Sequence, residues 1–123
     1  MFHNHNLLPS QVNVCYNRAR VVLNIHQEHQ HSGANPRVFE ICGSGAYQIC
    51  DSNPYVRALF PGGGIGLYED REQLFALIDD ALASPKDSEA SAARETVLAG
   101  HTFVDRIGTV LDAFHFETKI VEL

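Results

Sequence analysis

The residues best suited to chemistry lie in one short stretch, residues 32–40, which reads SGANPRVFE. Gly33 precedes Asn35, a favourable N-cap residue, and Pro36 suits the first position of a helix. The N-terminus of a helix has unpaired backbone N–H groups and the positive pole of the helix dipole, so it can bind a phosphate. The sequence therefore predicts a phosphate site at the start of this helix.

Two charged residues of the same predicted helix could complete the site. Arg37, in the first turn, could add a cation or a bidentate contact to a phosphate. Glu40 lies about one turn further on, where a carboxylate can accept hydrogen bonds from the vicinal hydroxyls of a ribose. The alternative is an ordinary capped helix whose Arg37 and Glu40 are solvated or paired with one another. The local features alone favour this alternative.

The chain contains seven histidines, and His26, His29 and His31 fall in one polar stretch. Their spacing matches neither the HExxH helix nor a Cys/His zinc pattern, so a polar loop is favoured and no metal site is predicted. Adventitious metal binding by the loop stays open as an alternative. A further interpretation places His26 at the end of a strand, where its ring could donate to a phosphate.

The cysteines and the glycine-rich segment receive structural interpretations. Cys15, Cys42 and Cys50 contain no CxxC pair, which favours buried free thiols over a redox or metal role. The glycines at 62, 63, 64 and 66 precede a predicted strand, whereas a dinucleotide-binding loop follows a strand and opens a helix. We therefore expect a flexible turn at these glycines.

The elements that must position these residues alternate between helices and short strands. The run of residues 20–25 is mostly apolar, as expected of a strand in a parallel sheet that is covered on both faces. The pattern predicts strands at 20–25, 47–50 and 65–68, and helices at 10–19, 35 to about 45, 56–60, 70 to about 85, 88–99 and 102–114. This order indicates an α/β class, a Rossmann-like three-layer fold with a parallel sheet of about three strands and a helical C-terminal third.

Length and charge restrict the function classes. The 123 residues, 45% of them apolar, suit a single domain over residues 1–123. A net charge of −6 and scattered Lys and Arg residues argue against nucleic acid as a partner. No apolar run has the roughly 20 residues needed to span a bilayer, and the first residues do not resemble a signal peptide. The sequence thus predicts no membrane partner and a cytoplasmic location.

Three stretches of the chain carry a family resemblance. Residues 16–24 fit the pattern Y-N-x-A-x-x-x-L-N, residues 35–45 contain R-x-F-E-x-x-x-x-G, and residues 101–106 fit H-T-[YF]-x-x-R. In this order and spacing they resemble the group 1 glycosyltransferase-like domain of spore-maturation-type proteins and their bacterial relatives. The resemblance covers roughly residues 10 to 115.

The resemblance implies the glycosyltransferase B fold, in which two Rossmann-like domains face each other and the C-terminal one holds most of the sugar nucleotide. It implies that the donor, a nucleotide sugar, is bound as a substrate and that no separate cofactor is needed. In retaining relatives, a Glu at the position of Glu40 contacts the donor ribose. Another Glu, eight residues earlier, approaches the donor sugar, and Ser32 takes that position here. The catalytic residues are therefore left unassigned.

The resemblance also implies that the chain is only part of such an enzyme. A complete donor domain of this type has about six parallel strands, and the sequence predicts about three. We expect the chain alone to be inactive, because transfer needs donor and acceptor held together and the acceptor-binding N-terminal domain is missing. The alternative is a non-catalytic assembly module that dimerises through an open sheet edge, with residues 21–25 as the expected edge.

Overall fold

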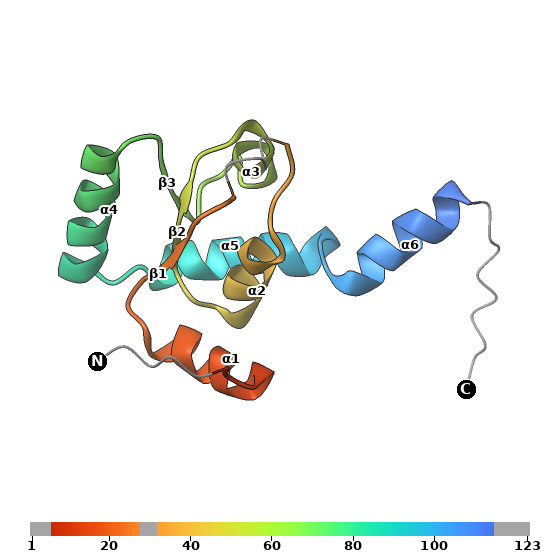
Figure 1. Cartoon of the computed structure of the whole chain (residues 1–123), viewed down its shortest axis with the longest axis horizontal. Coiled ribbons are helices and arrows are strands. Elements are labelled where there is room, and N and C mark those ends of the chain that lie inside the picture. The colour runs from red at the N-terminus through yellow and green to blue at the C-terminus, as the bar shows by residue number, and fades with distance from the viewer. Residues whose placement is uncertain (1–5, 28–31, 115–123) are drawn as a thin grey trace.

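The computed structural model describes residues 6–27 and 32–114 (Figure 1). The helices are α1 (Pro9–Arg18), α2 (Pro36–Ser44), α3 (Pro54–Leu59), α4 (Arg71–Ala83), α5 (Asp87–Gly100) and α6 (Phe103–Ala113). The strands are β1 (Val22–Asn24), β2 (Gln48–Asp51) and β3 (Gly66–Tyr68). Every element expected from the sequence is present, and the last third of the described chain is helical.

The three strands form one parallel sheet in the order β1-β2-β3. Helices α2 and α5 lie on one side of the sheet and α4 lies on the other (Figure 1). Each side has its own apolar core, one made by Val38, Cys42, Cys50, Val56, Phe60, Ala93 and Val97, the other by Tyr47, Ile49, Ala81 and Ala90. The fold is therefore a three-layer, Rossmann-like α/β fold with a small sheet, as predicted.

Strand β1 departs from the expectation that both of its faces are covered. Leu23 pairs in register with Ile49, which belongs to the core beneath α4. Helix α4 packs on β3 and β2, so the same face of β1 is left open. Leu23 is 47% exposed and Ile25 is 58% exposed. The expectation that both faces are covered was therefore wrong, whereas the expectation that this segment forms a sheet edge is confirmed, because β1 is an edge strand.

Side-chain caps fix where the helices begin. Asn35, Asn53, Asp70 and Thr102 each accept a hydrogen bond from the backbone N–H three residues further on. Helix α3 begins at Pro54, two residues earlier than predicted, because Asn53 caps it and Pro54 fits the first helical position.

The glycine-rich segment is a turn, as predicted, but one of its glycines is tightly packed. Gly64 has φ +102 and is buried. A Cβ atom built on Gly64 would lie 3.0 Å from the Ala93 nitrogen and from the Glu89 carbonyl oxygen of α5. The loop therefore packs against α5 and its backbone does not open a helix.

The cysteines only partly follow the sequence-based expectation. All three are free, and Cys42 and Cys50 are buried in the core between β2 and α2. Cys15 is exposed on α1, so the prediction of burial was wrong for this residue. Its helix buries none of its residues fully, which explains the difference.

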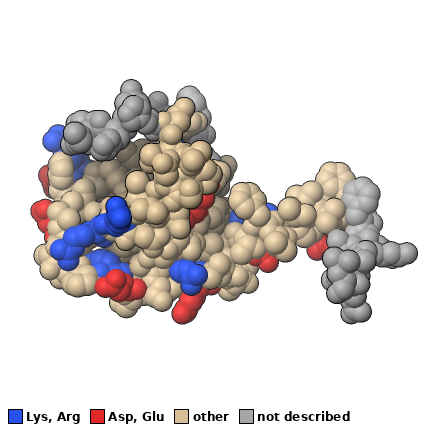
Figure 2. Space-filling view, turned by 90° about the horizontal axis from the view of Figure 1, so that it is seen from below, with Lys and Arg blue, Asp and Glu red and all other residues tan. Residues whose placement is uncertain are grey.

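The surface carries mixed charge, and one helix projects from it. Lys, Arg, Asp and Glu side chains are interspersed over the body of the molecule, whereas α6 extends away from it and is mostly uncharged (Figure 2). Phe103 and Val104 at the start of α6 are each 78% exposed. Among residues 6–27 and 32–114, no helix is both long enough and apolar enough to cross a bilayer.

Candidate functional site

Glu40 lies on the exposed side of α2, where three hollows in the surface meet. The first, the phosphate-end hollow, has a volume of 420 Å³ and is lined by Ile25, Gln27, Asn35, Pro36, Arg37 and Glu40. The second, the α1–α2 hollow, has a volume of 530 Å³. The third, the α2–α6 pocket, has a volume of 590 Å³. Among residues 6–27 and 32–114, no other residue lines all three.

The phosphate-end hollow contains the two charged residues that the sequence singled out. Arg37 and Glu40 are both exposed. Within the described part of the chain, no salt bridge involves either of them. Of the two forms of the ordinary-helix alternative, pairing of Arg37 with Glu40 is therefore not supported, whereas solvation of both side chains agrees with their exposure. Both side chains are available to a ligand on this side of α2.

Asn35 anchors the start of α2 to the sheet. Its Oδ1 accepts hydrogen bonds from the Val38 N–H at 3.2 Å and from Asn24 Nδ2 at 3.0 Å, and its Nδ2 donates to Asn24 Oδ1 at 3.0 Å. Asn24 is buried and also donates to Gln48 Oε1 at 3.2 Å. The Asn35 side chain thus caps α2, as predicted from the sequence, and also joins the helix end to Asn24 of β1, a contact that was not predicted.

Gly33 belongs to the loop just before α2 and lines the α2–α6 pocket. It adopts φ +100, a conformation that glycine tolerates best. Its carbonyl oxygen accepts a hydrogen bond from Asn53 Nδ2 at 3.2 Å. The cap of α3 therefore also holds the loop that precedes α2.

The α1–α2 hollow continues from Glu40 along α2 towards its C-terminal end. Its walls are Leu7, Pro9, Val12, Asn13 and Tyr16 from the α1 side, with Glu40, Gly43 and Ser44 from α2. Partial burial raises the pKa of the Tyr16 hydroxyl; the negative charge of Glu40 raises it further, and the positive charge of Arg37 opposes the increase. An apolar wall thus lies next to the two charged residues.

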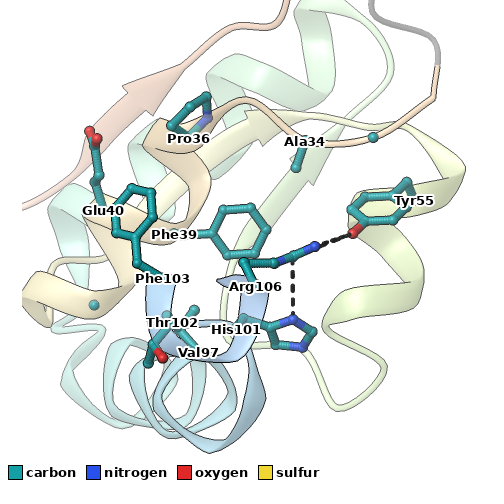
Figure 3. Close-up of a pocket in the computed structure, with 12 residues that line it drawn as sticks. Ala34, Pro36, Phe39, Glu40, Tyr55, Val97, His101, Thr102, Phe103 and Arg106 are labelled. Atoms are coloured by element: carbon teal, nitrogen blue, oxygen red, sulfur yellow. Dashed lines mark hydrogen bonds between the residues drawn. The ribbon is translucent and has the colours of Figure 1, made fainter. Parts of the chain in front are cut away.

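The α2–α6 pocket lies on the other flank of α2, and its lining includes the aromatic side chains of Phe39, Tyr55 and Phe103 (Figure 3). The guanidinium carbon of Arg106 lies 5.0 Å from the centroid of the Phe39 ring. Its nitrogens lie 3.4 and 3.5 Å from the Tyr55 hydroxyl and 3.5 Å from His101 Nδ1. The family motifs in the sequence include Phe39, His101 and Arg106, but none of the three was predicted to belong to a site. No feature of the sequence indicated a role for Tyr55.

His26 lies apart from these hollows. Its side chain is 2% exposed, and its Nδ1 lies 2.9 Å from Asp51 Oδ1. It lines none of the three hollows that border Glu40. The structure therefore gathers Gly33, Asn35, Arg37 and Glu40 around the start of α2 and leaves His26 outside the group. Of the predicted histidine loop, His29 and His31 lie outside the described residues.

Comparison with known proteins covers the part of the chain that contains the three sequence motifs. The family model for "Glycosyl transferase-like" proteins matches residues 1–112, which is most of the chain. The matched range includes α2 and all three hollows that meet at Glu40. No curated protein and no solved structure matches the chain. The chain therefore belongs to the glycosyl transferase-like family.

Proposed function

We propose that the chain binds a nucleotide sugar along the exposed side of α2, as the donor-binding part of a glycosyltransferase. The position of Glu40 at the junction of three hollows carries this proposal. Family membership supports a role in glycosyl transfer. The order of the three motifs further favours the spore-maturation type with a glycosyltransferase B fold.

The order of the hollows along α2 suits the order of groups in a nucleoside diphosphate. The phosphate-end hollow lies at the helix N-terminus, where Arg37 and the helix dipole favour an anion. Glu40 follows one turn later and can accept hydrogen bonds from ribose hydroxyls. The α1–α2 hollow comes next, with Tyr16 and other apolar side chains on its wall. We assign the phosphates, ribose and base to these three positions in that order.

The sugar of the donor then extends from the terminal phosphate past Pro36. Pro36 borders both the phosphate-end hollow and the α2–α6 pocket. The aromatic walls of that pocket, including Phe39 and Tyr55, suit the apolar face of a sugar ring. No residue is assigned to the chemical step, because Ser32 stands where a retaining mechanism would use a carboxylate.

The base assignment can be tested by ligand-observed NMR with a panel of nucleoside diphosphates and nucleotide sugars. Saturation transfer to the base protons is expected for wild type and should be strongly reduced in Tyr16→Ala. Val14→Ala, on the same helix but lining none of the three hollows, is the matched control. Unchanged transfer to the base in Tyr16→Ala would show that the base lies elsewhere.

Transfer itself requires an acceptor next to the donor in a site that excludes water. The three hollows are open on the surface of a single small domain. We therefore infer that this domain works with a second, acceptor-binding domain, and that α6, with its exposed Phe103 and Val104, lies on the side that such a domain would cover. Isolated, the chain is expected to bind donor without transferring sugar.

The second candidate function, a non-catalytic assembly module, is favoured by one specific observation. Strand β1 is an edge strand, and Leu23 within it and Ile25 just beyond it are both exposed. A second copy could cover this edge by pairing strand to strand. Light scattering should then report a dimer in wild type and a monomer in Ile25→Lys. A wild-type monomer at high concentration would rule out this candidate.

A further inference from the structure

A cluster of three potential metal ligands lies beside the sheet, outside the proposed donor site. It consists of His26, two residues beyond β1, with Cys50 and Asp51 at the end of β2. His26 and Cys50 are buried, whereas the Asp51 side chain is 31% exposed. The carboxyl ends of parallel strands are where α/β folds most often place ligands.

The three ligand atoms converge on one point. His26 Nδ1 lies 2.9 Å from Asp51 Oδ1 and 3.5 Å from Cys50 Sγ, and Cys50 Sγ lies 3.8 Å from Asp51 Oδ1. Zinc bound tetrahedrally by nitrogen, sulfur and oxygen at its usual bond lengths keeps these atoms about 3.3 to 3.6 Å apart. Shifts of a few tenths of an ångström would therefore turn the cluster into one face of a zinc tetrahedron.

The geometry does not fit a nucleophilic triad. In a Cys-His-Asp triad, the thiol and the carboxylate contact opposite nitrogens of the imidazole. Here both contact Nδ1, and Nε2 is buried without a hydrogen-bond partner among the described residues.

A purely structural polar cluster explains the arrangement less well. The Nε2 atom does not separate the two explanations, because it lacks a partner among residues 6–27 and 32–114 whether or not an ion is bound. A thiol is also a weak hydrogen-bond donor. A chain of hydrogen bonds would not require sulfur, nitrogen and oxygen to meet on the same side of the ring.

We propose that His26 Nδ1, Cys50 Sγ and Asp51 Oδ1 form a three-ligand site for a divalent transition-metal ion, with Zn²⁺ as the best-fitting occupant. A mixed nitrogen, sulfur and oxygen ligand set suits zinc and excludes Mg²⁺ and Ca²⁺, which prefer oxygen alone. The fourth position is left to water. Binding releases the Cys50 thiol proton to solvent, and the imidazole proton resides on Nε2.

The residues around the cluster would allow an ion to enter from the surface and would give it a structural function. A hollow of 390 Å³, lined by Asp51 and Tyr68 among others, connects the carboxylate to the surface. His26 stands between Ile25 and Gln27, which line the phosphate-end hollow. The backbone N–H of His26 also donates to Asp51 Oδ1 at 2.7 Å. A bound ion would therefore fix the base of that hollow by joining β2 to the chain that follows β1.

The experiment is a titration of the full chain, stripped with a chelator, with Co²⁺ as the spectroscopic probe and with Zn²⁺ by calorimetry. We expect one equivalent of Co²⁺ to produce a near-ultraviolet thiolate-to-metal charge-transfer band, which Zn²⁺ abolishes. The band should be absent in Cys50→Ser and kept in Cys15→Ser, whose cysteine is exposed on α1. Mg²⁺ should neither compete nor raise the melting temperature.

Two further variants keep the proposal falsifiable if Cys50→Ser folds poorly. Asp51→Asn retains an oxygen for the His26 N–H and should weaken Zn²⁺ binding by about tenfold or more. The double substitution of His29→Gln and His31→Gln should leave the band unchanged. Absence of the band in wild type, its persistence in Cys50→Ser, or its loss in the double variant would overturn the proposal. The last result would identify an adventitious ion on the histidine loop only.

Discussion

The guanidinium carbon of Arg106 on α6 lies 5.0 Å from the centre of the Phe39 ring on α2. This contact joins two motifs that are more than 60 residues apart in the chain. It accompanies the longer contacts of Arg106 to Tyr55 and His101 (Figure 3). Since α6 otherwise projects from the body of the molecule, this cation–π contact connects it to the helix that carries Glu40.

Replacing Arg106 should therefore loosen α6 more than it destabilises the whole domain. A cation–π contact at an exposed site contributes about 0.5 to 1 kcal/mol. In Arg106→Ala, we expect faster amide hydrogen exchange in α6 and unchanged exchange in β2. Arg106→Lys keeps the charge and should recover part of the protection. Equal acceleration in β2 and α6 would contradict this view.

The cap at Asn35 should matter more for stability than its exposure suggests. Its side chain satisfies the Val38 N–H and pairs twice with the buried Asn24. Asn35→Ala should lower the free energy of unfolding by about 2 kcal/mol, since it removes a cap and leaves a buried amide without a partner. Urea unfolding measures the loss. Asn13→Ala, on the exposed side of α1, is the control, and a loss no greater than in this control would be evidence against the anchoring role.

The glycine turn offers a test of packing. Gly64→Ala places a Cβ 3.0 Å from the α5 backbone at a positive φ, so it should lower the free energy of unfolding by more than about 1 kcal/mol. Gly62→Ala is the matched control, because a Cβ there meets no atom within 4 Å. Thermal unfolding of the two variants should rank Gly64→Ala clearly below Gly62→Ala. Equal melting temperatures would mean that the turn adapts freely.

The buried thiol of Cys42 should make stability fall at alkaline pH. Burial raises its pKa from 9.0 to about 11. Because the folded pKa is the higher one, the stabilisation is complete below about pH 9 and is lost as pH rises towards 11. The loss can reach about 2 to 3 kcal/mol. Urea unfolding between pH 8 and pH 11 should show a shallower decline in Cys42→Ala than in wild type, and parallel declines would refute the assignment.

Much of the fold could be predicted from the sequence because local signals fix its elements. Asn35, Pro36 and Gly45 define both ends of α2 without help from the rest of the chain. The alternation of elements then indicates a parallel sheet. Cover on both faces of β1 was predicted wrongly, because an apolar run looks the same in a central strand and in an edge strand that leaves Leu23 exposed. The same segment was correctly expected to be a sheet edge.

The site could be predicted only where its residues are neighbours in sequence. Gly33, Asn35, Arg37 and Glu40 lie within eight residues, so helix chemistry alone was enough to group them. Tyr55 reaches the α2–α6 pocket from another helix, and the meeting of Cys50 with His26 depends on the register between β1 and β2. Such contacts depend on packing between distant segments, for which a single sequence has no local signal.

The most direct test of the proposed function is calorimetric binding of nucleoside diphosphates to wild type, Glu40→Gln and Glu95→Gln. Glu95 is an exposed glutamate on α5 that lines none of the three hollows, so it controls for the loss of one charge. Wild type and Glu95→Gln should bind equally. Glu40→Gln should bind about 10 to 100 times more weakly, because charged hydrogen bonds to the ribose are lost. Binding that is unchanged in Glu40→Gln, or undetectable in wild type, would contradict a donor site at Glu40.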